Sequence, residues 1–282
     1  MSTTTYIRLE IVIPDHLQEI FISGFEGLEF AGFEQQEDRL IAYIDQQQMN
    51  DSGREELENW LMAQRDECYI ESESVEEERN WNEEWEQSIQ PQRIGRFVIT
   101  PTWGNPEITA EDVVLEIDPK MAFGTGYHET TRLILRMLPE VVQPGDTILD
   151  AGTGTGVLAI AALKIGAAHA LGFDIDEWSH DNATENALLN LVSDRFVIKQ
   201  GGFEQLDPGR QYDITIANIN RNALIENAVV LASTVTPGGA LLLSGLLRQD
   251  EEQMLKQSAY SGWKHVSSIY ENEWVAIWLQ RP

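Results

Sequence analysis

The sequence predicts an α/β protein: a doubly wound, mostly parallel sheet preceded by a small α+β domain. Three observations support this fold class. Residues 147–176 read as a strand, a glycine-rich turn, a helix and a second strand that ends in acidic residues. From Val113 onward strands alternate with helices, and the last two strands follow each other directly, which predicts an antiparallel closing strand. The first 76 residues read as β-α-β-β-α-β, the order of the ferredoxin-like split unit.

The amino-terminal domain is predicted to span residues 1–76. Alternating apolar residues and turn signals predict its strands, and apolar residues that share one face predict its helices. In chain order these elements are expected at Tyr6–Ile13, Asp15–Gly24, Leu28–Gln36, Arg39–Asp45, Ser52–Gln64 and Cys68–Val75. Ser52 is expected to cap the second helix, whose apolar face includes Leu57 and Leu61.

A charged segment connects this domain to the rest of the chain. Residues 77–90 are predicted to form a helical linker, because Trp81 and Trp85 lie four residues apart and so share one helix face. The second domain is predicted to span residues 91–282. Besides the glycine turn and its flanks, its elements are expected at Arg96–Ile99, Arg132–Leu138, Glu177–Asn190, Arg195–Lys199, Tyr212–Asn218, Asn222–Ala232, Ala240–Ser244, Val266–Tyr270 and Trp274–Gln280.

The net charge of −28 is unevenly distributed along the chain. Residues 1–90 carry 23 acidic and five basic residues, a net charge of −18. A surface of this sign repels phosphate backbones, which counts against direct binding of nucleic acid. It attracts a basic protein and accelerates their encounter. On charge alone, an acidic face that only confers solubility is equally consistent with the sequence.

The cysteine content and the hydropathy pattern predict a cytoplasmic protein. Cys68 is the single cysteine, so we expect neither a disulfide framework nor a metal site, and the compartment is expected to be reducing. Residues 1–10 lack the basic stretch and apolar core of a signal peptide. No apolar run approaches the roughly 20 residues of a membrane helix, so no membrane partner is expected.

The glycine turn predicts the cofactor. The strand from Thr147 ends at Asp150, and Gly152, Gly154 and Gly156 follow, permitting backbone torsions and close ligand approach that other residues prevent. A dinucleotide site requires Gly-x-Gly-x-x-Gly, whereas here the third glycine comes one position early. This spacing favours S-adenosylmethionine, which has no phosphate, over NAD. A glycine-rich turn without a ligand is the alternative.

Three further segments are expected near this turn at the carboxyl ends of the strands. Asp174, 22 residues after Gly152, ends the next strand and can accept hydrogen bonds from both ribose hydroxyls. Asn218 ends the fourth strand, where an amide can orient an incoming amine or hold the amino-acid part of the cofactor. An asparagine that only caps the next helix is the alternative.

The third of these segments, residues 123–131, is expected to be a flexible loop that closes over a ligand and leads into a helix. Alternatively, Thr130 or Thr131 simply caps that helix. His128 offers a general base, but a structural or solvated histidine is the preferred interpretation.

This loop resembles a known family. Phe123-Gly124-Thr125-Gly126 with His128, Thr130 and Thr131 is similar to the Phe-Gly-Thr-Gly-Thr-His-Pro-Thr-Thr loop of the PrmA family, the methyltransferases of a large-subunit ribosomal protein (number eleven). Also similar are the glycine turn with its helix, Asp174-Ile175-Asp176, Ala217-Asn218-Ile219, Ser244-Gly245-Leu246 and Glu273-Trp274. The resemblance extends from about Trp81 to the carboxyl terminus.

The resemblance implies a class I S-adenosylmethionine-dependent methyltransferase fold and a function. The family's cofactor-binding residues fall on Thr131, Gly152, Asp174 and Asn218, to which the turn adds Gly154 and Gly156. The implied reaction is methylation of lysine ε-amino groups and of the terminal α-amino group of a basic ribosomal protein of the stalk base. The ferredoxin-like domain would recognise that protein, and the linker would let this domain swing.

The chain departs from the family pattern at Tyr127, Glu129 and Asn220, which replace a threonine, a proline and a leucine, and mildly at Thr153 and Thr155, which replace a cysteine and a serine. Two alternative functions therefore stay open. One is a methyltransferase of the same fold that acts on another basic protein or on a small molecule. The other is a module that binds S-adenosylmethionine without catalysis. The glycine spacing disfavours an NAD-dependent oxidoreductase.

Overall fold

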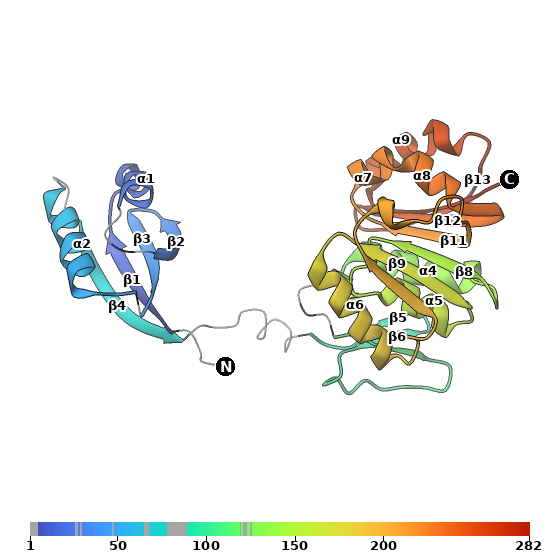
Figure 1. Cartoon of the computed structure of the whole chain (residues 1–282), viewed down its shortest axis with the longest axis horizontal. Helices are drawn as coiled ribbons and strands as arrows, with labels where there is room; N and C mark the ends of the chain where they lie inside the picture. Colours follow the sequence, from blue (N-terminus) through green and yellow to red (C-terminus); the bar gives the residue numbers. More distant parts are fainter. Residues whose placement is uncertain are drawn as a thin grey trace. The chain divides into compact units, whose positions relative to one another are not determined.

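The chain forms two compact units, residues 1–81 and residues 82–282 (Figure 1). The computed structural model describes residues 5–282 except 26–27, 29, 47, 65–67, 78–88, 119, 121–122 and 125. Most of the predicted linker, including Trp81 and Trp85, therefore lies outside the described residues. Within the described part of the chain, no helix is long and apolar enough to cross a membrane.

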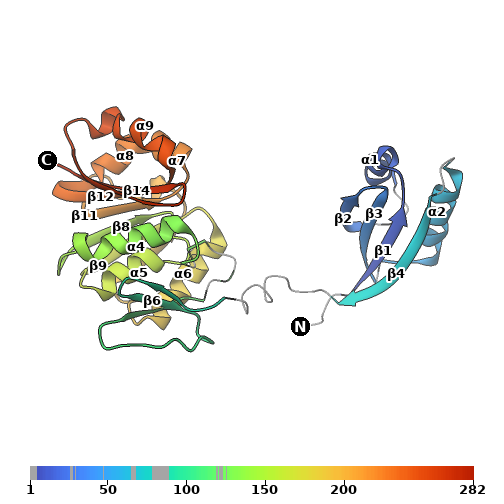
Figure 2. The same ribbon diagram turned by 180° about the vertical axis from the view of Figure 1, so that it is seen from behind.

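The amino-terminal unit is a four-stranded antiparallel sheet with two helices. Its elements follow the predicted order, β1 (Thr5–Val12), α1 (Asp15–Gly24), β2 (Phe30–Gln36), β3 (Arg39–Asp45), α2 (Asp51–Ala63) and β4 (Tyr69–Glu77). The strand order is β2-β3-β1-β4, visible from behind in Figure 2. Alternate residues of β1, Ile7, Leu9 and Ile11, are buried in one core together with Phe21 of α1 and Leu57 of α2.

The predicted cap of α2 is wrong. The helix starts at Asp51, and the side chain of Asn50 caps it by accepting a hydrogen bond from the Gly53 amide at 2.8 Å. Asn50 has the extended backbone of a capping residue, whereas Ser52 already lies inside the first turn.

The second unit is built around a seven-stranded mixed sheet with the order β10-β9-β8-β11-β12-β14-β13. These strands are β8 (Thr147–Ala151), β9 (His169–Asp174), β10 (Phe196–Gln200), β11 (Tyr212–Asn218), β12 (Val235–Leu247), β13 (Lys264–Glu271) and β14 (Trp274–Gln280). Strand β14 runs antiparallel to both of its neighbours, and the other neighbouring pairs are parallel. The doubly wound sheet and its antiparallel closing strand are confirmed.

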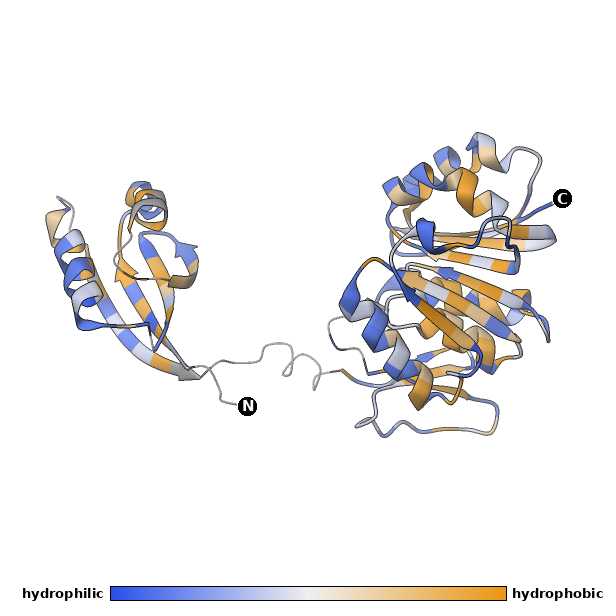
Figure 3. Ribbon diagram, viewed as in Figure 1, coloured by the Kyte–Doolittle hydropathy of each residue, from blue (hydrophilic) through white to orange (hydrophobic). Residues whose placement is uncertain are grey.

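Both faces of this sheet are buried. Successive residues of β8, Ile148 and Leu149, belong to two different apolar cores, so the strands are apolar on both sides (Figure 3). Helices α4, α5 and α6 contribute to the first core and α7, α8 and α9 to the second. The helices are α4 (Glu129–Val141), α5 (Val157–Lys164), α6 (Glu177–Leu189), α7 (Arg221–Glu226), α8 (Ala228–Ser233) and α9 (Glu251–Leu255).

Short elements complete this unit. Strands β5 (Gln92–Ile94), β6 (Phe97–Thr100) and β7 (Val113–Glu116) form a separate three-stranded sheet, and one-turn 3-10 helices lie at Phe203–Gln205, Arg248–Asp250 and Ser258–Tyr260. The single helix predicted at 222–232 is wrong, because α7 and α8 are separate. They part at Asn227, whose side chain donates to the carbonyl of Ala223 at 2.9 Å.

Candidate active site

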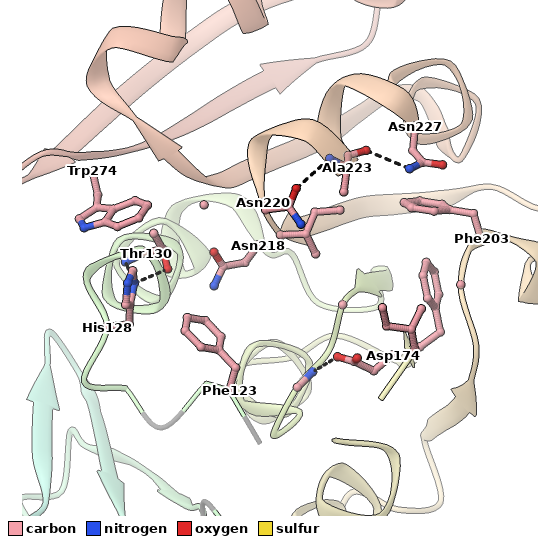
Figure 4. Close-up of a pocket in the computed structure, with 17 residues that line it drawn as sticks. Phe123, His128, Thr130, Asp174, Phe203, Asn218, Asn220, Ala223, Asn227 and Trp274 are labelled. Carbon is pink, nitrogen blue, oxygen red and sulfur yellow. Dashed lines mark hydrogen bonds between the residues drawn. The ribbon is translucent and has the colours of Figure 1, made fainter. Parts of the chain in front are cut away.

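A pocket of about 540 Å³ lies at the carboxyl ends of β8, β9 and β11 (Figure 4). This is the edge of the sheet where ligands bind in open α/β folds. Four of the predicted site residues line it, namely Gly152, Gly154, Asp174 and Asn218. The structure therefore brings these four predicted residues together around one pocket.

The glycine turn between β8 and α5 forms one side of the pocket with its backbone. Gly154 has a φ of +53°, and a Cβ atom there would overlap the carbonyl oxygen of Phe123. That same carbonyl accepts a hydrogen bond from the Thr155 amide at 2.8 Å. The Thr155 hydroxyl donates to the carbonyl of Gly124, also at 2.8 Å. The turn and the loop before α4 are thus in direct contact, which only a glycine at position 154 permits.

Asp174 ends β9 with its carboxylate held at the pocket. One oxygen, Oδ2, accepts from the Gly154 amide at 2.9 Å, and the other accepts from the Asp176 amide at 3.1 Å. Two backbone donors fix the orientation of the carboxylate, and each oxygen keeps a further lone pair for a ligand hydroxyl.

Asp150, at the end of β8, is a fully buried carboxyl behind the turn. Burial raises its pKa to about 7, although the Thr153 hydroxyl, which donates to Oδ2 at 2.8 Å, opposes this shift. Its Oδ1 has no hydrogen-bond partner among the residues that are described. The nearby charge of Asp174 also disfavours ionisation of Asp150.

Asn218, at the end of β11, presents a buried amide oxygen. Its Oδ1 has no hydrogen bond within the described part of the chain, and its Nδ2 lies 3.5 Å from the hydroxyl of Thr131. A buried acceptor without a partner is costly, so this oxygen is a position where a ligand donor is favoured. Asn220, in contrast, caps α7 by accepting from the Ala223 amide at 3.0 Å.

Two predicted cofactor residues do not line the pocket as it is described. Thr131 is fully buried in α4 behind Asn218, and its neighbour Thr130 lines the pocket instead. Gly156 precedes α5 with a φ of +81°, and a Cβ atom there would come within 3.1 Å of the ring of Phe196. Both residues support the pocket from behind.

A second side of the pocket is an aromatic wall made of Phe123, His128 and Trp274. The His128 ring lies 4.8 Å from Trp274 and 5.2 Å from Phe123, centroid to centroid. Figure 4 shows the three rings together, away from Asp174. The loop sequence and Glu273-Trp274 were noted from the resemblance, but nothing in the sequence indicated that they form one surface.

His128 caps α4, so the alternative in which Thr130 or Thr131 caps this helix is wrong. Its Nδ1 accepts from the Thr130 amide at 3.3 Å and lies 2.8 Å from the Thr130 hydroxyl. The helix consequently begins at Glu129, three residues before the predicted start. With Nδ1 in these contacts, the ring is fixed at the helix terminus.

The far end of the pocket is lined by residues that the sequence analysis missed. Phe203 contacts Phe173 with a centroid distance of 5.1 Å, and both line the pocket with Ala223 and Asn227. Phe203 follows the strand next to the one that ends at Asp174. The position of Phe203 shortly after β10 could have indicated its role, because ligands bind at the carboxyl ends of parallel strands.

Comparison with known proteins identifies the family. The profile of the family described as ribosomal protein L11 methyltransferase (PrmA) matches residues 18–282. This chain belongs to the PrmA family. It is similar to the ribosomal protein L11 methyltransferase of Chlorobaculum parvum, with 35% identity over 99% of this chain and 98% of that protein. The corresponding protein of Hahella chejuensis is 41% identical over 79% of this chain and 74% of its own length.

A solved structure extends the likeness to three dimensions. The crystal structure of ribosomal protein L11 methylase from Lactobacillus delbrueckii subsp. bulgaricus superposes with a TM-score of 0.63 at 26% identity. The match covers 68% of this chain and 99% of that chain. The resemblance to the PrmA family is therefore confirmed over both sequence and fold.

The cofactor of this methyltransferase family is S-adenosylmethionine, and the described residues fit it. The glycine turn offers a backbone surface, Asp174 offers a fixed carboxylate, and Asn218 offers a buried acceptor without a partner. These groups suit a nucleoside with an amino-acid tail. Among the described residues, no group of His, Cys, Asp and Glu is arranged to hold a metal ion.

Proposed function

We propose that this PrmA-family enzyme methylates lysine ε-amino groups and the terminal α-amino group of ribosomal protein L11. The observation that carries the proposal is the buried, unpartnered Oδ1 of Asn218 between the glycine turn and the aromatic wall. The relatives named above are ribosomal protein L11 methyltransferases, which supports this choice of acceptor.

The cofactor side of the pocket is assigned to the turn. Asp174 would accept hydrogen bonds from the ribose hydroxyls, and the backbone at Gly152 and Gly154 would face the cofactor closely. Thr131 would act through its contact with Asn218, and Gly156 would permit the close packing of α5. When bound, the cofactor supplies a methyl group already activated by its sulfonium.

The acceptor side is assigned to the aromatic wall, and Asn218 is proposed both to hold the amino-acid part of the cofactor and to orient the incoming amine. A lysine amine has an ordinary pKa near 10.4, so it must lose a proton before it can react. Apolar walls exclude water and lower the pKa of such an amine. The Oδ1 of Asn218 would accept one amine N–H and so orient the nitrogen lone pair toward the reacting centre, which contributes alignment rather than base catalysis. His128, whose Nδ1 contacts Thr130, shapes the wall.

The amino-terminal domain, residues 1–76, is proposed to recognise the acceptor. Its order β-α-β-β-α-β and its strand order β2-β3-β1-β4 support a ferredoxin-like assignment. Exposed acidic side chains on α2, at Asp51, Glu55, Glu56 and Glu58, suit a basic protein such as one from the ribosomal stalk base. Residues 77–90 are proposed as linker and 91–282 as catalytic domain, in a cytoplasmic enzyme that does not bind nucleic acid directly.

The test is transfer of a radiolabelled methyl group from S-adenosylmethionine to a fractionated set of undermethylated ribosomal proteins. We expect one labelled band, ribosomal protein L11, and its loss in Asp174→Ala. A matched control is Asp176→Asn, which alters the neighbouring carboxylate that caps α6, does not line the pocket as described, and should leave labelling intact.

Calorimetry of cofactor binding separates the outcomes. Asp174→Ala should weaken S-adenosylmethionine roughly 10- to 100-fold, because hydrogen bonds to a charged group contribute about 1.5–3 kcal/mol. Cofactor binding by the wild type without any label on ribosomal protein L11 would contradict the acceptor assignment. That result would favour another acceptor or a non-catalytic module.

A further inference from the structure

A cluster of charged side chains joins the β13–β14 turn to the first turns of α4. Glu271 ends β13, and its Oε1 accepts from Arg132 at 2.8 Å from Nε, with Nη2 at 2.6 Å. Its Oε2 lies 2.7 Å from Nη1 of Arg136, one helical turn further along. One carboxylate thus bridges two guanidinium groups that lie 139 and 135 residues away in the sequence.

A second contact crosses the same junction. The side chain of Asn272, in the turn itself, donates to Oε1 of Glu129 at 2.9 Å. Glu129 also lies 3.6 Å from Arg132, and Arg132 donates to the carbonyl of Tyr127. We call Glu129, Arg132, Arg136, Glu271 and Asn272 the charged cluster.

The charged cluster lies directly beside the aromatic wall. His128 precedes Glu129 and caps α4, whereas Trp274 begins β14 two residues after Asn272. The two rings, from helix and strand, meet at 4.8 Å. A shift of the β13–β14 turn along α4 would separate the two rings, because one belongs to the cap of the helix and the other to the strand that follows the turn.

We propose that Arg132 and Glu271 are positioning residues for the acceptor side of the pocket: they hold the β13–β14 turn against α4 so that Trp274 and His128 form one wall. This inference rests on the proposed function, since it concerns the amine acceptor. Side chains of Arg132 and Glu271 are only 19% and 21% exposed, so their interaction is less screened than that of a surface pair.

The experiment compares steady-state methylation of ribosomal protein L11 by the wild-type enzyme and by the Glu271→Gln variant, both full length. Glutamine keeps the shape but removes the charge that two arginines share. We expect kcat/KM for the protein acceptor to fall about tenfold, while the Kd of S-adenosylmethionine, measured by calorimetry, stays within twofold. A purely structural role would change both quantities together.

A double-mutant cycle with Trp274→Phe tests whether Glu271 acts through the wall. If it does, Glu271→Gln adds less than twofold to the loss already caused by Trp274→Phe. Arg136→Met removes only the outer, more exposed partner and should give the same pattern with a loss of about threefold. This variant keeps the test available if Glu271→Gln folds poorly.

The matched control is Asp112→Asn, which removes a carboxylate that pairs with Arg93 in the same unit; neither residue lines the pocket as described. It should leave kcat/KM for the acceptor within twofold. An equal loss in Asp112→Asn and Glu271→Gln, or independent effects in the cycle, would overturn the inference but not the proposed function. Failure of the wild type to methylate ribosomal protein L11 would overturn both.

Discussion

The two sides of the pocket are built in different ways. The side proposed to bind the cofactor, the cofactor side, consists mostly of backbone: a glycine turn between β8 and α5, fixed to the Asp174 carboxylate by an amide. The side proposed to bind the acceptor, the acceptor side, consists of side chains, Phe123, His128 and Trp274, which come from a loop, a helix cap and the last strand. One side has its geometry set by local torsions, and the other depends on contacts between distant segments.

This difference predicts different sensitivities. The backbone of the glycine turn, at positive φ, leaves no room for a Cβ atom, so replacing a glycine of the turn by alanine should strongly reduce cofactor binding. On the acceptor side, several neighbouring rings and charged groups together position the wall, so the loss of one side chain should be partly compensated by the others. A side chain added in the glycine turn should therefore abolish cofactor binding, and mutations on the acceptor side should reduce rates by graded amounts.

Gly154→Ala should have the largest effect. The new Cβ atom would overlap the Phe123 carbonyl oxygen in a residue with φ of +53°. We expect no measurable S-adenosylmethionine binding by calorimetry and a lower melting temperature. The control is Gly209→Ala, which also has positive φ, at +78°, but no atom within 4 Å of the added methyl group. Cofactor affinity near that of the wild type in Gly154→Ala would contradict the close contact between turn and loop.

Asp150→Asn should reveal the buried carboxyl behind the turn. Its folded pKa of about 7 lies above the ordinary value near 3.9, so its contribution to stability is present below pH 4 and is lost as pH rises to 7. Between pH 5 and pH 8 the wild type should therefore lose about 3 kcal/mol of unfolding free energy relative to Asp150→Asn, whose amide does not titrate.

Asp112→Asn is the matched control for this pH dependence. Arg93, through its hydrogen bond, lowers the pKa of Asp112, so Asp112 stays ionised in the folded and largely in the unfolded protein above pH 5. Its replacement should change stability equally at pH 5 and pH 8. Denaturant unfolding at both values measures each difference, and parallel curves for Asp150→Asn would contradict the raised pKa.

His128→Ala should have a moderate effect on the acceptor side. Its Nδ1 contacts Thr130 and caps α4, so we expect a loss of about 1 kcal/mol in stability and less than tenfold in kcat. Single-turnover methylation measures the chemical step. A thousandfold loss would show instead that His128 acts as a general base, and the two sides of the pocket would then both be essential.

Tyr127→Phe should have the smallest effect. The Tyr127 hydroxyl accepts from the Gln90 amide at 2.5 Å and donates to the Gln90 carbonyl at 2.9 Å, but these contacts are exposed. We expect a loss of two- to threefold in kcat/KM. Tyr270→Phe, which removes the hydroxyl bonded to Glu251, is the control and should have no effect. A loss above tenfold would show that the loop depends on this single anchor.

Local pattern predicted much of the fold. The order of strands and helices in both units follows the sequence analysis, because alternation and helical periodicity reflect which faces are buried. Most errors lie at helix ends, and strand β5 with its separate sheet was not predicted. Asn50 caps the helix whose cap was predicted at Ser52, His128 caps the helix for which Thr130 or Thr131 was the alternative cap, and Asn227 divides a helix predicted as continuous. Several side chains can cap one terminus, and only the backbone path selects among them.

The sequence by itself determined that the glycine turn and Asp174 lie together at one edge of the sheet, where we propose that the cofactor binds. Glycine spacing and an acidic residue at the end of the next strand act over about 25 residues, and the parallel sheet brings them together by its regular geometry. Tertiary structure alone decided the acceptor side. The contact of His128 with Trp274 and the bridge from Arg132 to Glu271 join segments far apart in the chain. No local periodicity specifies such contacts, because they exist only once the last strand is inserted beside β12.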